Sequence, residues 1–231
     1  MEYYLMYYLS GIIILPVFIF ALICQLKVKT NFKKYSRIMS ASNMTGADAA
    51  WRLLQLNGIT DVKIQRIGGT LTDYYDPAKK VICLSSDVFD SRSIAAIGVA
   101  CHEAGHAVQH AQGYSPLKFR NFVIPATRIG SALGVPLCII GLIINSAMLA
   151  YIGVILYAFV ALFQLITLPV EFNASSRALQ TISEYGFLNS EEYSGAKKVL
   201  TAAALTYVAA LASAIATMLR LLLIIAGGRR R

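Results

Sequence analysis

Charged residues are scarce in this chain. They make up 14% of its 231 residues, whereas 57% are hydrophobic and the mean hydropathy is +0.59. A soluble domain carries about 25% charged and about 45–50% apolar residues. The shortage of charge therefore argues against a soluble protein and favours an integral membrane protein.

The sequence also lacks any nucleic-acid recognition motif, despite a net charge of +9. Its basic residues gather beside apolar runs, in one cluster from Lys27 to Arg37 and in a second at Lys118, Arg120 and Arg128. Such clusters typically mark the cytoplasmic flanks of membrane spans. We therefore expect a lipid bilayer, and no nucleic acid, as the partner of these charges.

Cysteines are few, and none forms a pair with metal-knuckle spacing. The four are Cys24, Cys83, Cys101 and Cys138. Scattered cysteines in so apolar a chain predict neither a disulfide framework nor a cysteine-based metal site. Cys101, beside the histidines, is expected to be a buried packing residue.

Four apolar segments predict a mainly α, polytopic membrane protein with about four transmembrane helices. The first, Tyr3–Cys24, has no basic segment before it and indicates an anchor rather than a cleaved signal. The stretch from Phe122 to Val170 is long enough for a hairpin of two spans, broken near Asn145-Ser146. The fourth, Leu200–Ile225, is rich in small residues that favour close helix packing in lipid.

Two features bear on the membrane topology. The first span carries tyrosines suited to an interfacial belt, namely Tyr3, Tyr4, Tyr7 and Tyr8. Arg220 interrupts the last apolar segment, which leaves open whether that segment crosses the bilayer.

The polar segment Lys27–Phe119 predicts a small α+β insert, which is zincin-like because it ends in a helix that carries His-Glu-x-x-His. Thr45–Asn57 has a threonine cap, an early aspartate and a following glycine, which together indicate a helix. Val62–Ile67 and Val81–Leu84 are typical of short strands. Ser93–Ala111 is expected to form the last helix of the insert.

The expected organisation therefore has five segments. These are a transmembrane helix over 1–26, the zincin-like insert over 27–120, a transmembrane hairpin over 121–170, a third-ligand helix and loop over 171–199, and a last transmembrane helix with a basic tail over 200–231. With four spans, the insert and the 171–199 segment share one face, and the Lys and Arg content of that face predicts the cytoplasmic side of the membrane. The closing Arg229–Arg231 would then lie outside, against the same rule.

All three histidines lie in one stretch, VACHEAGHAVQHAQGY, which contains His-Glu-x-x-His. Residues four apart on a helix share a face, so His102 and His106 can direct two nitrogens at one ion. Glu103 falls beside them, where it can take a proton from a zinc-bound water whose pKa is lowered to about 7. Gly105 is expected to leave room near the metal. The motif predicts a zinc site.

His110 is not expected to be the third ligand. Eight residues along a helix separate it from His102 by about 12 Å, too far for both to bind one ion at about 2 Å. Glu171 is the better candidate, because a carboxylate directly after the apolar run and Pro169 needs a partner. The alternative is a solvated glutamate at a helix start. Two histidines and a glutamate leave a fourth position for water, as in catalytic zinc sites.

Peptide hydrolysis also needs a donor for the oxyanion, and Arg177 and Tyr114 are the candidates. Either is more commonly a surface or packing residue, and Arg177 has the alternative role of orienting the Glu171 carboxylate. The strand Val81–Leu84 is a candidate for binding an extended substrate by edge pairing. Asp73 and Asp76 are interpreted as turn residues rather than a second ion site.

The stretch HEAGHAVQHAQGY, followed by SPLKFRN and VIP and preceded by GGTLTDYYDPAKKVICLS, resembles the bacterial neutral zinc metallopeptidase family of YugP type. The resemblance covers nearly the whole chain, including EFNASSRA. It implies a membrane-bound zinc peptidase, gluzincin-like, with His102, His106 and Glu171 as ligands and Glu103 as catalytic base.

The chain is more distantly similar to membrane metalloproteases of HtpX type. Their third-ligand motif carries Asp four residues after the Glu, a position that here is Ser175. Asn173 and Arg177 are the candidates to supply the contact that this Asp would make.

We therefore expect a membrane-bound zinc endopeptidase that cuts unfolded or membrane-associated polypeptides at the membrane surface. One alternative is an intramembrane zinc protease, although Asp87, Asp90 and Arg92 precede the motif too closely for a full span. The other is a non-catalytic membrane scaffold or subunit with an idle zinc site. The substrate, the oligomeric state and any membrane partner are not specified by the sequence.

Overall fold

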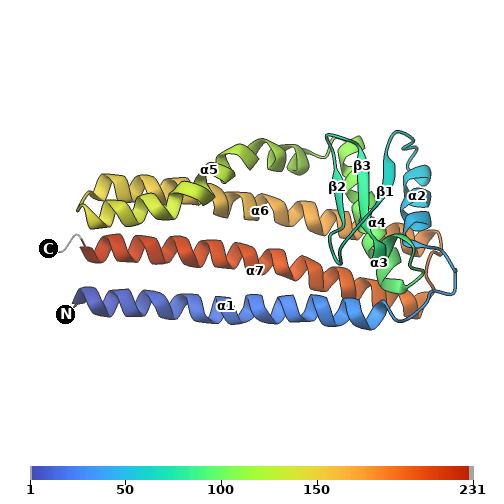
Figure 1. Cartoon of the computed structure of the whole chain (residues 1–231), viewed down its shortest axis with the longest axis horizontal. Coiled ribbons are helices and arrows are strands. Elements are labelled where there is room, and N and C mark those ends of the chain that lie inside the picture. The colour runs from blue at the N-terminus through green and yellow to red at the C-terminus, as the bar shows by residue number, and fades with distance from the viewer. Residues whose placement is uncertain (1, 229–231) are drawn as a thin grey trace. The chain divides into compact units, whose positions relative to one another are not determined.

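The computed structural model describes residues 2–228 (Figure 1). The closing arginines Arg229–Arg231 and the side chains of the belt tyrosines Tyr3, Tyr4, Tyr7 and Tyr8 lie outside the described part of the chain. The chain forms two compact units. The first contains Met1–Cys24, Phe119–Leu168 and Thr206–Arg231, and the second contains Gln25–Lys118 and Pro169–Leu205.

Four long helices dominate the chain, as the apolar segments predict. They are α1 (Glu2–Tyr35), α5 (Ser115–Ile143), α6 (Ala147–Glu184) and α7 (Ser190–Gly228). Within the described residues, all four are long and apolar enough to cross a membrane. The expectation of a mainly α protein with about four spanning helices is confirmed.

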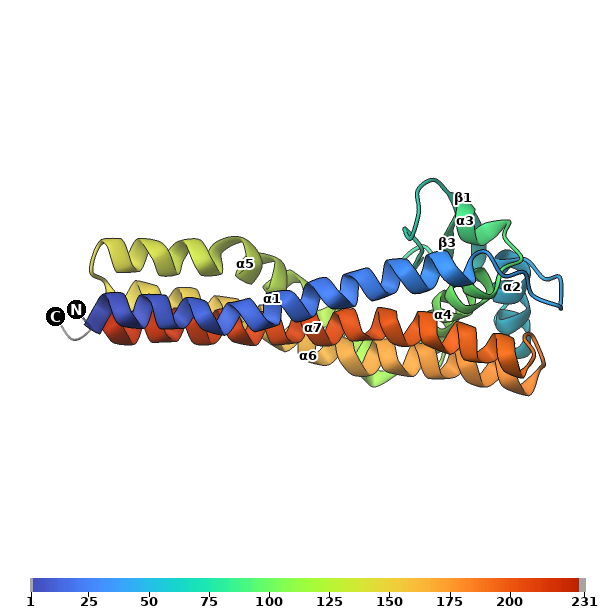
Figure 2. The same cartoon turned by 90° about the horizontal axis from the view of Figure 1, so that it is seen from below.

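The first unit contains a close helical hairpin. α5 and α6 lie side by side and are joined by a tight turn (Figures 1 and 2). A Cβ on Gly141 of α5 would collide with the backbone nitrogen of Ala150 on α6, so only glycine permits this approach. Asn145 adopts a φ of 56° in the turn, a conformation that asparagine tolerates better than most residues. The helix break thus falls where Asn145-Ser146 predicts it.

α6 does not end at Pro169. The proline lies inside the helix, which continues to Glu184. Its missing N–H removes one backbone hydrogen bond, to the carbonyl four residues earlier, without terminating the helix. Glu171 therefore lies within a helix rather than at a helix start.

The second unit combines a small sheet with short helices, as expected for an α+β insert. In chain order the elements are α2 (Gly46–Leu56), β1 (Lys63–Ile67), β2 (Tyr74–Asp76), β3 (Val81–Ser85), α3 (Ser86–Phe89) and α4 (Ile94–Ala111). The strand order is β1-β3-β2, with β1 parallel and β2 antiparallel to β3. Sequence reasoning missed β2, because TDYYDP was interpreted only as a turn, and it also missed the four-residue helix α3.

Local capping fixes where the two main helices of this unit begin. The Thr45 hydroxyl accepts a hydrogen bond from the Asp48 backbone N–H, and the Asp48 carboxylate accepts one from the Thr45 N–H. This capping box satisfies donors that have no partner within the helix. Ser93 caps α4 by accepting from the Ala96 N–H. Both starts agree with the sequence signals.

α4 is the central, buried helix of the unit. Its small side chains let neighbouring helices approach, and it packs in one apolar core with residues of α2, α6 and α7. Cys101 belongs to this core and is fully buried, as a packing residue should be. The His-Glu-x-x-His motif is thus held on a buried helix rather than on a loop.

The position of β3 overturns one expectation. β3 is the central strand, paired with β1 over all of Val81–Ser85 and with β2 over Val81–Cys83. Because its hydrogen-bonding groups are used on both sides, the interpretation of Val81–Leu84 as an edge that binds extended substrate is wrong. The outer edges of the sheet belong to β1 and β2.

Candidate metal centre

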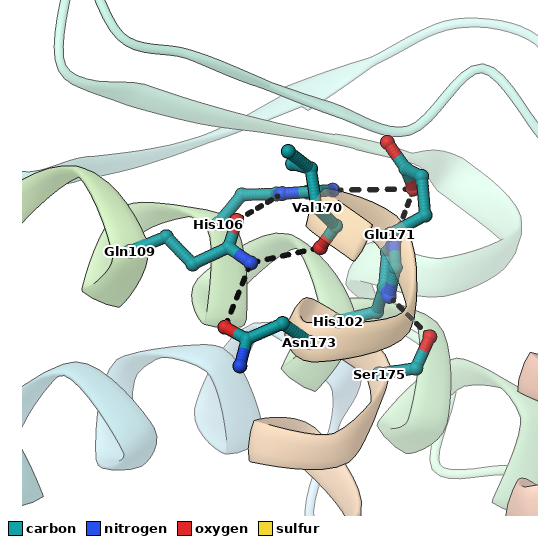
Figure 3. A network of polar contacts seen from close by, with 7 residues as sticks. All are labelled: His102, His106, Gln109, Val170, Glu171, Asn173 and Ser175. Atoms are coloured by element: carbon teal, nitrogen blue, oxygen red, sulfur yellow. Dashed lines mark hydrogen bonds and ion pairs between the residues drawn. The ribbon is translucent and has the colours of Figure 1, made fainter. Parts of the chain in front are cut away.

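His102 and His106 project from the same side of α4, and Glu171 meets them from α6 (Figure 3). Nε2 of His102 lies 3.3 Å from Oε2 of Glu171, and Nε2 of His106 lies 3.5 Å from the same oxygen. The two imidazole rings stand nearly perpendicular, at an interplanar angle of 80°. The structure therefore brings together the three residues that the sequence selects as ligands.

The third residue of this cluster is buried. Glu171 is 3% exposed, and its carboxylate faces the imidazoles rather than solvent. Burying a carboxylate is unfavourable unless opposite charge or hydrogen-bond donors compensate it. The alternative of a solvated glutamate at a helix start is therefore wrong.

The donor set fits a zinc ion. Imidazole nitrogen and carboxylate oxygen are both zinc ligands, and around a tetrahedral ion with bonds of about 2.0–2.1 Å such atoms lie about 3.3 Å apart. The two Nε2–Oε2 distances, 3.3 and 3.5 Å, match this ligand–ligand separation. All three candidate ligand atoms lie within 4.8 Å of one another. Three protein ligands leave one position for water or substrate, as catalytic zinc requires.

Negative charge at the site favours a cation. Burial alone would lower the pKa of His106, but hydrogen bonding to Glu171 and the nearby Glu103 outweigh it, so the pKa of His106 is raised. Carboxylates that stabilise a proton on this imidazole stabilise a divalent cation at the same place.

Glu103 lies beside the histidine pair and is buried, with 8% of its surface exposed. The pKa of its carboxyl is raised, chiefly because burial disfavours the charged form. The two imidazoles oppose this shift, while the Glu171 charge adds to it. A carboxylate whose proton affinity is raised is a suitable general base near neutral pH.

Both imidazoles are also held at their second nitrogen. Nδ1 of His102 lies 3.0 Å from the Ser175 hydroxyl oxygen, and Nδ1 of His106 lies 3.0 Å from Oε1 of Gln109 (Figure 3). Such partners orient metal-binding histidines and fix which nitrogen carries the proton. Ser175 itself contacts the histidine, so neither Asn173 nor Arg177 is needed to replace the aspartate of the HtpX-type motif there.

Asn173 and Arg177 contribute to a neighbouring network instead. Nε2 of Gln109 donates to Val170 O at 2.8 Å and to Asn173 Oδ1 at 3.0 Å. Nε of Arg177 donates to the same Asn173 oxygen at 2.7 Å, and its Nη1 donates to Gln112 Oε1 at 2.6 Å. Sequence reasoning missed Gln109, although a polar residue one turn after His106 in an apolar helix is a usable signal.

Gly105 has a different role from the predicted one. A Cβ at this position would lie 2.7 Å from the Ala174 carbonyl oxygen. The missing side chain therefore makes room for the backbone of α6 rather than for the metal. This close approach sets Glu171, on the same helix as Ala174, beside the histidines.

The remaining candidates lie elsewhere. Nδ1 of His110 pairs with the Tyr75 hydroxyl at 2.8 Å, and His110 is not part of the cluster, as its spacing predicts. Tyr114 follows α4, where its backbone N–H donates to Gln109 O. Asp73 accepts from Ser85, and Asp76 accepts from the backbone of residues 78 and 79. The two aspartates thus behave as structural residues of loop and turn.

The chain thus combines long apolar helices and a small sheet with a His-Glu-x-x-His helix that faces Glu171 and could hold a metal ion. Residues 10–226 match the model of the family described as "Putative neutral zinc metallopeptidase", and the chain belongs to this family. It is 47% identical to "Putative membrane protease YugP" of Bacillus subtilis (strain 168) over 205 residues, which cover 89% of this chain and 91% of that relative. No solved structure matches the chain with significance.

Proposed function

We propose that this protein is a membrane-bound, zinc-dependent endopeptidase. The observation that carries the proposal is the meeting of Glu171 with His102 and His106, with the buried Glu103 beside them. Family membership agrees with it, because the family is described as zinc metallopeptidases and a relative as a membrane protease.

The roles follow from the donor set. His102, His106 and Glu171 hold zinc, which supplies Lewis acidity and lowers the pKa of a water to about 7. The Glu103 carboxylate accepts the proton of the attacking water as its oxygen bonds to the substrate carbonyl carbon. Glu103 then returns that proton to the amide nitrogen as the peptide C–N bond breaks.

An oxyanion forms on the substrate carbonyl during attack, and Arg177 and Tyr114 remain the proposed donors to it. The guanidinium of Arg177 is directed at Asn173 and Gln112, which favours an orienting role for this residue. Tyr114 is half-buried just after the α4 helix and offers a hydroxyl at the end of the motif.

The proposed substrates are unfolded or membrane-associated polypeptides, cut where lipid meets water. Four helices that are long and apolar enough to cross a bilayer support a membrane location. The motif helix α4 is not among them and belongs to the unit that holds the sheet. This favours a surface site over the intramembrane alternative.

The test compares wild type, Glu103→Gln and Glu171→Gln in detergent, measuring zinc content and cleavage of casein or a quenched peptide. We expect about one zinc per wild-type chain and activity that a chelator abolishes. Glu103→Gln should keep its zinc and lose cleavage by at least about 10²-fold, whereas Glu171→Gln should lose zinc. Wild type with zinc but without cleavage would support the idle scaffold. Full zinc and activity in Glu171→Gln would refute the ligand set.

A further inference from the structure

His106 can bind a cation through Nε2 only in one tautomer, the neutral form that carries its proton on Nδ1. Its Nδ1 lies 3.0 Å from Oε1 of Gln109, and an amide oxygen only accepts. The contact therefore selects the required tautomer, provided that the oxygen of Gln109, and not its nitrogen, faces the imidazole.

Gln109 has no freedom to turn its amide around. The side chain is fully buried, and its nitrogen lies between two oxygens, Val170 O at 2.8 Å and Asn173 Oδ1 at 3.0 Å. Its two N–H groups match these two acceptors. A reversed amide would set oxygen against the carbonyl oxygen of Val170 and leave buried groups unsatisfied.

One of these two acceptors is itself fixed from outside. Asn173 presents oxygen rather than nitrogen to Gln109 because Arg177 donates its Nε–H to that same oxygen at 2.7 Å. A guanidinium has five donors and no acceptor, and it stays charged at any physiological pH. The direction of every hydrogen bond from Arg177 to His106 is therefore determined by a group that cannot reverse.

We propose that Arg177, Asn173 and Gln109 form a directional hydrogen-bond relay that fixes the tautomer of His106 and so sets the zinc affinity of the site. All three are positioning residues in this proposal, because each acts on the metal site through another side chain, which selects the orienting role of Arg177 over the oxyanion-donor role. The inference rests on the proposed zinc function and assigns Arg177 an orienting task.

The chain offers a matched control for the test. Gln109 and Gln112 lie three residues apart at the end of α4, but the relay from Asn173 to His106 runs through the Gln109 side chain. The side chain of Gln112 instead accepts a hydrogen bond from Nη1 of Arg177, whereas the path to His106 starts from Nε of Arg177. Gln109→Met and Gln112→Met are the same chemical change inside and outside the relay.

The first measurement is the zinc dissociation constant of the full-length protein in detergent, by competition with a chromophoric chelator. We expect Gln109→Met to bind zinc about 10–100-fold more weakly than wild type, and Gln112→Met to bind as wild type does. Circular dichroism shows whether each variant keeps its helix content. Wild-type zinc affinity in Gln109→Met would overturn the relay, whereas absence of zinc from wild type itself would refute the proposed function.

Two substitutions of Asn173 give an independent test that distinguishes the hydrogen-bond relay from simple packing. Asn173→Asp keeps the acceptor between Arg177 and Gln109 and should retain zinc affinity, while Asn173→Leu, of similar size, should weaken it. Equal affinities in the two variants would contradict the relay. This pair also decides the matter if Gln109→Met fails to fold.

The second readout is the tautomer itself. With ¹⁵N-labelled histidine, NMR shows the protonation of the ring nitrogens of all three histidines. His110 provides an internal reference, because its Nδ1 pairs with the Tyr75 hydroxyl outside the relay. In the metal-free protein, at a pH where the imidazoles are neutral, wild type should show His106 protonated at Nδ1 alone, whereas bound zinc would impose that tautomer in every variant. Gln109→Met and Asn173→Leu should show a mixed population at this histidine while His110 is unchanged. If Gln109 and Asn173 had a purely structural role, wild type and both variants would give the same spectra.

Discussion

Nδ1 of His102 lies 3.0 Å from the hydroxyl oxygen of Ser175, although 73 positions separate the two residues in the chain. Ser175 lies one helical turn after Glu171, so a single turn of α6 supplies one proposed ligand and contacts another. The two imidazoles thus have unlike supports. His102 depends on α6, whereas His106 depends on Gln109 of its own helix.

The contact predicts that Ser175→Ala weakens zinc binding while leaving the fold intact. Without the hydroxyl acceptor, His102 loses the partner that orients its ring, and losses of this kind are about 10–100-fold in affinity. A serine hydroxyl is an uncharged acceptor, so the loss of zinc affinity should lie near the lower end of that range. The measurement is chelator competition on the purified protein.

Ser176→Ala is the matched control, because Ser176 is the exposed neighbour of Ser175 on the same helix. It should bind zinc as wild type does, and Ser175→Thr should recover most of the affinity by restoring the hydroxyl. Identical affinities for the two alanine variants would show that the Ser175 contact contributes nothing.

A methyl group at Gly105 should separate the two ligand-bearing helices. Because its Cβ would lie 2.7 Å from the Ala174 carbonyl oxygen, a backbone atom, Gly105→Ala must displace α6 relative to α4 in this unit. Overpacking of this kind costs about 1–3 kcal/mol of stability, and a displaced Glu171 should reduce zinc content. Thermal unfolding and zinc content are measured together.

Gly98→Ala provides the comparison on the same helix. Its Cβ would meet Ala196 Cβ at 3.3 Å, a milder contact that lies away from the ligands. We expect a smaller loss of stability and normal zinc content. Should Gly98→Ala lose as much zinc as Gly105→Ala, the loss would reflect general destabilisation rather than ligand displacement.

Zinc should stabilise the protein through two histidines and not through the third. A ligand that binds only the folded state adds about 2.7 kcal/mol at a concentration 100-fold above its dissociation constant. We expect the melting temperature of wild type and His110→Gln to rise with added zinc after chelator treatment. His102→Gln and His106→Gln should show no rise. A zinc-independent melting temperature in His110→Gln would reinstate His110 as a ligand.

Much of this site was accessible from sequence because its determinants are local. Spacing alone selects His102 and His106, since an α-helix places residues four apart on one face. Helix length alone excludes His110. The starts of α2 and α4 follow from Thr45 and Ser93, whose side chains cap their own chain neighbours.

What the sequence could not provide depends on contacts between distant segments. Nothing local indicates that Ser175 would orient His102 or that Gly105 faces Ala174, because both facts arise from the approach of α6 to α4. β2 was missed because three residues pair only through β3. Pairing on both sides of β3 also overturned its interpretation as an edge strand.

The proposed cytoplasmic location of the site predicts the accessibility of a cysteine at the end of α4. Ala111 is exposed, and the four natural cysteines are buried, so Ala111→Cys offers a thiol against a low background. A membrane-impermeant maleimide should label it only after the cells are permeabilised, because the Lys and Arg clusters favour the cytoplasmic side. Ile144→Cys, exposed in the α5–α6 turn, should instead be labelled in intact cells if α5 and α6 both cross the membrane. Labelling of Ala111→Cys in intact cells would reverse the orientation. Failure to label it even after permeabilisation, with Ile144→Cys reactive, would favour the intramembrane protease.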